Sequence, residues 1–150
     1  MKKRAEMCAN FIMEGKFDSE EAHKKIDIAC SEFHKEGEIY RAPALKYKTD
    51  RWGINRKTRP TIYMSKELQR LCDIIEPKKE IIKQIIDENE LKAEFFIAIY
   101  AYGCQGPEMY CEEPAIALAH YLGAEIGIDY YSMGDLGEEE EYDYEEEKEE

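Results

Sequence analysis

The sequence lacks the short motifs that mark many catalytic and nucleotide-binding sites. It contains no GxSxG, HExxH, GxGxxG or Walker loop. The histidines are His23, His34 and His120, and no such motif surrounds any of them. A catalytic nucleophile needs a neighbouring base that is itself held by a third group, and no residue pattern supplies such a set. We therefore expect a non-enzymatic protein with no catalytic residues and no cofactor.

Cysteine pairs and long apolar runs are also missing. The five cysteines are an odd number and form no CxxC motif. No stretch approaches the roughly 20 apolar residues of a membrane span, and the opening MKKR is not followed by the apolar run of a secretory signal. We expect a cytoplasmic protein with reduced thiols and no membrane contact. Cys30 and His34 lie four residues apart, but the cysteine spacing matches no zinc motif, so no metal site is expected.

Acidic residues are abundant, and they are concentrated at one end. The formal net charge is -13. Residues 135–150 contain eleven acids and one lysine, a net charge of -10, so the other 134 residues carry only -3. A run of like charges repels itself and stays disordered. The sequence thus predicts one domain over residues 1–134 and a disordered acidic tail over residues 135–150.

The tail has the charge spacing of a nucleic-acid strand. An extended chain advances about 3.3 to 3.6 Å per residue, and one DNA strand carries a phosphate about every 3.4 Å. The tail could mimic a nucleic acid and occupy a basic groove, dock on the chain's own basic residues, or only aid solubility. The candidate partner-binding residues are Glu138, Glu139, Glu140, Glu141, Tyr142, Asp143, Tyr144, Glu145, Glu146 and Glu147.

Residues 35–60 form the opposite kind of segment. They hold eight basic residues against three acids, a net +5, and aromatic residues lie between them. Basic side chains on phosphates and rings on bases would suit a nucleic acid. However, the net charge of -13 repels nucleic acid at long range, so direct binding is not the leading expectation. The residues of this basic strip are Arg41, Lys46, Lys48, Arg51, Trp52, Arg56, Lys57 and Arg59.

Hydrophobic spacing predicts alternating strands and helices. We expect strands at about 6–14, 91–103 and 124–132, and helices at about 19–28, 66–75, 78–88 and 113–123. Within 44–57 the alternation changes parity near Asp50, which indicates a bulge or a turn between two strands. The order β-α-ββ-α-α-β-α-β predicts a two-layer α+β domain, with helices on one face of a mixed or antiparallel sheet. An uncovered sheet edge could make a dimer.

Several segments, in this order and spacing, resemble a family of small bacterial and phage domains. They are NFIMEGKFDSEEAHKKIDI followed by HKEGE, then DRWGI, then LQRLCDIIEPKKEIIKQI, and finally PEMYCEEPAIALAHYLGAEIGIDYY. Together they are similar to the domain-of-unknown-function family 4279 over about residues 8–131. The resemblance implies no catalytic residues. It implies a role in bacterial conflict, for instance as an immunity protein beside a toxin.

Two functional hypotheses follow from these features. The first is a protein-binding inhibitor of the immunity or phage counter-defence type. It would block a basic nucleic-acid-handling partner, such as a nuclease or a defence effector, by steric occlusion and charge complementarity. The second is a nucleic-acid or nucleotide binder that uses the basic strip, with the acidic tail as an autoinhibitory lid.

Overall fold

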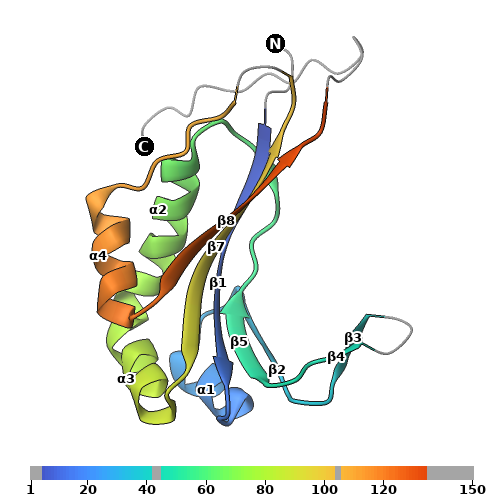
Figure 1. Cartoon of the computed structure of the whole chain (residues 1–150). Coiled ribbons are helices and arrows are strands. Elements are labelled where there is room, and N and C mark those ends of the chain that lie inside the picture. Colours follow the sequence, from blue (N-terminus) through green and yellow to red (C-terminus); the bar gives the residue numbers. More distant parts are fainter. Residues whose placement is uncertain (1–4, 42–44, 104–105, 135–150) are drawn as a thin grey trace.

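The computed structural model describes residues 5–41, 45–103 and 106–134. Helices cover one face of a mostly antiparallel sheet, and the other face carries no helix among these residues (Figure 1). This confirms the predicted α+β class and the helices on one face. The predicted tail, residues 135–150, lies outside the described residues. None of the helices in the described ranges is long and apolar enough to cross a membrane.

The central strand of the sheet is β1 (Ala5–Gly15), and its alternation explains how the two layers meet. Every second side chain on it is fully buried beneath the helices: Ala5, Met7, Ala9, Phe11 and Met13. A strand presents successive side chains to opposite faces. The intervening residues, such as Glu6 and Glu14, therefore belong to the face without helices.

The sheet extends from β1 in both directions. Its order is β2 (Ser31–His34), β5 (Asp50–Ile54), β1, β7 (Lys92–Ala101) and β8 (Glu125–Ser132), while β6 (Arg59–Pro60) also pairs with β1. Only the β7–β8 pair is parallel among these strands. A parallel pair needs a crossover, and α4 (Glu113–Leu122) supplies it.

The helices form the second layer. They are α1 (Ser19–Ile26), α2 (Met64–Ile75) and α3 (Lys79–Asn89) in addition to α4, and a short 3₁₀ turn, η1 (Glu76–Lys78), joins α2 to α3. Pro77 lies in this turn because its ring cannot continue an α-helix. Asp18 caps α1, since its side chain accepts a hydrogen bond from the backbone N–H of Glu21 at 3.0 Å.

The expected helix boundaries agree with the structure to within two or three residues, and the differences lie in the short strands. Residues 31–34, 39–41 and 59–60 form short strands that the sequence pattern does not predict. The parity change near Asp50 is a turn, not a bulge: β3 (Ile39–Arg41) and β4 (Leu45–Lys46) make a separate hairpin, and β5 begins at Asp50. The carboxylate of Asp50 accepts hydrogen bonds from Ser19 and from the backbone of Glu36, which anchors this turn.

Candidate protein-binding site

Trp52 does not belong to any binding surface. Its side chain is 0% exposed and lies among the core residues. The ring meets Phe11 edge-on, with ring centroids 6.2 Å apart. The prediction that Trp52 stacks on a nucleic-acid base is therefore wrong. Its strand partners explain the error, because β5 lies inside the sheet and directs this side chain toward the helices.

Two arginines of the basic strip are engaged by acids from other elements. Arg51 Nη2 lies 2.9 Å from Glu14 Oε2 on the neighbouring strand. Arg59 Nε lies 3.2 Å from Oε1 of Glu67, a carboxylate that is 1% exposed and also accepts from Arg70 at 2.6 Å. Burying a carboxylate is costly unless it is paired. These contacts fasten β6 to the start of α2, so much of the charge of Arg59 serves the fold.

The remaining basic residues of the strip lie in separate places. Arg41 and Lys46 are exposed on the β3–β4 hairpin, and Lys48 follows it. Arg56 and Lys57 lie in the connection from β5 to β6, where the Arg56 backbone N–H donates to Asn10 Oδ1 at 2.9 Å. The structure thus divides the strip between a hairpin and a connecting segment. The tail residues Glu138–Glu147 lie outside the described residues.

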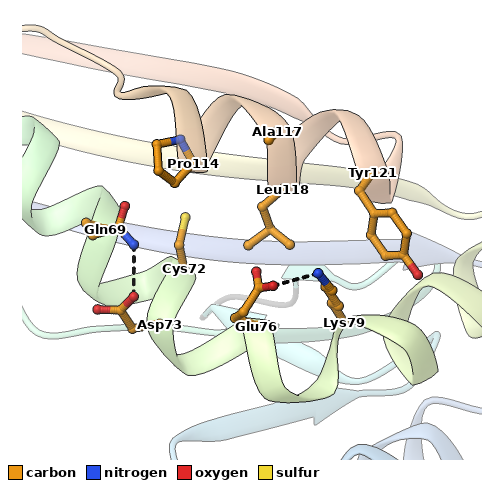
Figure 2. A pocket seen from close by; sticks show the side chains of 9 residues that line it. All are labelled: Gln69, Cys72, Asp73, Glu76, Lys79, Pro114, Ala117, Leu118 and Tyr121. Carbon is orange, nitrogen blue, oxygen red and sulfur yellow. Dashed lines mark hydrogen bonds and ion pairs between the residues drawn. The ribbon is translucent and has the colours of Figure 1, made fainter.

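A pocket that the sequence analysis did not predict lies between α2 and α4 (Figure 2). Its volume is about 510 Å³, which falls in the range of roughly 300 to 1,000 Å³ that is usual for ligand pockets. One wall comes from α4 and the other from α2, η1 and the first residue of α3. The lining residues are Gln69, Cys72, Asp73, Glu76, Lys79, Pro114, Ala117, Leu118 and Tyr121.

Hydrogen-bond acceptors dominate the polar side of this pocket. Asp73 Oδ1 accepts from Gln69 Nε2 at 2.8 Å, and Glu76 Oε1 accepts from Lys79 Nζ at 2.6 Å (Figure 2). The Oε1 atom of Gln69 is buried and has no hydrogen-bond partner among the described residues. A buried acceptor without a donor is costly. The α2 side of the pocket is therefore suited to a group that donates several hydrogen bonds and carries positive charge.

The opposite wall carries an aromatic ring that already contacts cations. Lys79 Nζ lies 5.4 Å and Lys83 Nζ lies 5.6 Å from the centroid of the Tyr121 ring. Lys79 is also paired with Glu76, and this hydrogen bond raises the pKa of its ammonium group. Ammonium and guanidinium groups are attracted to the face of such a ring. The pocket therefore combines acceptors with an aromatic wall, as cation-binding pockets do.

The thiol in the pocket is not suited to nucleophilic chemistry. Cys72 is 3% exposed. Burial, together with the charges of Asp73 and Glu76, raises its pKa to about 12. Because the thiolate is the reactive form, a cysteine with such a pKa is inert near neutral pH. Cys72 and Leu118 instead form an apolar floor.

No sequence motif marks this pocket. Cys72 follows the helical spacing of apolar residues, and Asp73, Glu76 and Lys79 look like ordinary surface charges on a helix. The pocket arises only because the α4 crossover places Tyr121 opposite the end of α2.

Comparison with known proteins identifies the domain without assigning it an activity. The chain matches the family model described as domain of unknown function DUF4279 over residues 5–133. No curated protein and no solved structure matches the chain.

Proposed function

We propose that this chain, which belongs to the DUF4279 family, is a non-enzymatic cytoplasmic inhibitor of the immunity or phage counter-defence type. It binds a basic protein that handles nucleic acid, such as a nuclease or a defence effector, and occludes it. The observation that carries the proposal is the acceptor-lined pocket between α2 and α4 with Tyr121 on its far wall. This pocket receives an arginine or lysine side chain of the partner.

An arginine of the partner is the better fit of the two. Its planar guanidinium presents five N–H donors and stacks on aromatic faces. In the pocket those donors meet the carboxylates of Asp73 and Glu76, while the plane faces Tyr121. Arginines of this kind, held in a pocket near the centre of an interface, are frequent hot spots.

The acidic tail supplies the long-range part of the same recognition. Residues 135–150 carry -10 of the net -13, and such a charge steers a basic partner toward the chain before contact. Tyr142 and Tyr144 lie among the tail acids in the sequence, and their rings stack where the bases of a nucleic acid would. The tail thus competes for a groove that normally holds nucleic acid, and it makes association fast and sensitive to salt.

The proposal is tested by capture from host lysate, followed by identification of the captured protein and titration with it. The wild-type chain is compared with the pocket variant Asp73→Asn/Glu76→Gln and with the matched control Glu21→Gln/Glu88→Gln. The control makes the same charge change at exposed positions on α1 and α3. We expect a basic protein to be held by wild type and control, and to bind the pocket variant at least about tenfold more weakly, since hydrogen bonds to charged groups are typically worth about 1.5–3 kcal/mol. Equal binding by all three would refute a role for the pocket.

Replacing Lys79 gives a second test, in which the affinity for the partner is expected to rise instead of fall. In the free protein the Lys79 ammonium is paired with Glu76 and lies over the Tyr121 ring. It therefore competes with the cation of the partner for both groups. Replacing it in Lys79→Met removes the competitor and keeps a side chain of similar length. We expect tighter binding of the basic partner, measured by calorimetry, and weaker binding would contradict the proposed position of the incoming cation.

Capture from host lysate also tests the alternative function, binding of nucleic acid, when a truncated chain is compared with the full chain. The β3–β4 hairpin exposes Arg41 and Lys46, and Tyr40 beside them is 53% exposed. A truncation to residues 1–134 that captures nuclease-sensitive material, where the full chain does not, would establish that function, with the tail as a lid. A truncation that loses a basic protein instead supports the tail as a decoy.

A further inference from the structure

The two edges of the sheet are protected very differently. On one side the sheet ends with β2, which is four residues long and contains Glu32 and His34. On the other side it ends with β8, which is eight residues long with the sequence EIGIDYYS. Natural edge strands are usually kept from pairing by shortness, lysine, proline or a covering segment. β2 follows this pattern, whereas β8 has no lysine, arginine or proline.

Strand β8 also exposes apolar side chains on both of its faces. Ile128 is 38% exposed and Tyr130 is 47% exposed on the face toward the helices, and Tyr131 is 45% exposed on the other. Ile116, on the neighbouring helix α4, is 51% exposed. In the described part of the chain, no segment pairs with the outer edge of β8. Exposed apolar residues beside unpaired backbone mark a surface for strand addition.

We propose that a second copy of this chain pairs antiparallel with β8 and continues the sheet across a two-fold axis at Ile128. This inference is independent of the proposed partner, because it uses neither the pocket nor the acidic tail. A two-fold interface is self-complementary, so each residue that contacts a partner residue is contacted in the same way. The sequence of β8 meets this requirement in one register.

Charge and length select that register. Centring the axis on Ile128 places Ile128 opposite itself and Ile126 opposite Tyr130, and it sets both acids of β8 opposite uncharged residues. Shifting the axis to Asp129 puts two aspartates opposite each other, and shifting it to Gly127 puts Glu125 opposite Asp129. Like charges directly opposite each other are destabilising. Centring on Tyr130 avoids the clash but pairs only residues 128–132, five residues, instead of the seven from 125 to 131.

The experiment measures the mass of the full chain in solution by light scattering across a concentration series. We expect a dimer with twice the 17.6 kDa mass of one chain. Ile128→Lys is expected to convert it to the monomer. Ile39→Lys is the matched control, because Ile39 is an equally apolar side chain, 64% exposed, on the β3–β4 hairpin. Circular dichroism shows whether each variant retains the fold.

Two results would overturn the proposal. One is a wild-type chain that remains monomeric at every concentration, and the other is a dimer that Ile39→Lys dissociates while Ile128→Lys does not. Crosslinking then tests the register in a Cys30→Ser background, with the linked peptides identified by mass spectrometry. Ile128→Cys should form an intermolecular disulfide rapidly. Tyr130→Cys should not, because positions 130 of the two copies would be roughly 13 Å apart along the strands.

Discussion

Replacing Trp52 separates the two roles that its sequence context allows, base stacking and core packing. A buried aromatic side chain removes about 150–250 Å² from water, which corresponds to roughly 4–6 kcal/mol at about 25 cal/mol per Å². Measured losses for large aromatic residues changed to alanine are about 3–5 kcal/mol. Trp52 is 0% exposed, so Trp52→Ala should lower the free energy of unfolding by about 3–5 kcal/mol. That is a large part of the roughly 5–15 kcal/mol of a typical domain.

Trp52→Phe should behave differently, because the indole nitrogen is buried without a hydrogen-bond partner among the described residues. An orphaned donor costs about 1–3 kcal/mol. Phenylalanine fills most of the same space and removes that donor. The lost contact area and the removed polar group act in opposite directions, so the net change in unfolding free energy should stay within about 1 kcal/mol.

Both variants are measured by urea unfolding, followed by far-ultraviolet circular dichroism because each removes the only tryptophan of the chain. The wild-type curve is checked independently by the fluorescence of that tryptophan. A loss below about 1 kcal/mol for Trp52→Ala would refute its place in the core and return it to the candidate stacking residues. Equal losses for alanine and phenylalanine would show that the indole N–H has a partner.

Three further predictions follow from backbone contacts and titration. A Cβ at Gly53 would collide with the backbone carbonyl of Phe11, whereas one at Gly127 would collide with the movable end of the Glu94 side chain and make ordinary contact with Phe96. Gly53→Ala should therefore lower the free energy of unfolding by urea by about 1–3 kcal/mol or more, and Gly127→Ala by clearly less. The pKa of Cys72 rises from 9.0 to about 12 on folding, so its contribution to stability is complete below pH 9 and is lost as the pH rises toward 12; Cys72→Ala should remove this part of the alkaline loss. Burial opposes ionisation of Asp50, but hydrogen bonds from the Glu36 backbone and from Ser19 outweigh it and lower its pKa below 3.8; Asp50→Asn should be less stable than wild type at neutral pH, and the difference should shrink as acid protonates the wild-type carboxylate.

The long periodic elements could be predicted from the sequence, and the short ones could not. Residues 91–103 carry apolar side chains on both faces of a strand, as a central strand of a sheet does, and residues 66–88 show helical spacing interrupted by Pro77. Local pattern and tertiary environment agree in both segments. Strand β2 contains Ser31, Glu32, Phe33 and His34 and has no clear alternation. It forms because its backbone pairs with β5, a contact about twenty residues away in the sequence. Such pairings depend on tertiary structure and leave little local pattern.

The binding residues were harder to predict than the fold, because a pocket is a property of two elements together. The sequence shows Tyr121 and Asp73 on separate helices, and the distance between those helices follows from the crossover between β7 and β8. For Trp52 the sequence indicated a binding residue where the structure has a core residue. Its basic neighbours in the sequence indicated a surface, yet the side chains on either side of it in a strand point to the other face, so their charge says nothing about its exposure.

A run of basic residues in a sequence does not by itself indicate a basic surface on the folded protein. Segment 35–60 has a net charge of +5, but folding brings acids from elsewhere to its cations. Lys35 Nζ lies 2.7 Å from Glu20, Arg51 Nη2 lies 2.9 Å from Glu14, and Arg59 Nε lies 3.2 Å from the buried Glu67. Each such pair weakens the field that a distant phosphate would feel. The pocket is the reverse case, since the two acids Asp73 and Glu76 lie on the same wall as a single lysine, Lys79. This excess of acid in the pocket supports the proposal of a cationic partner, although the sequence of residues 35–60 by itself indicates an anionic one.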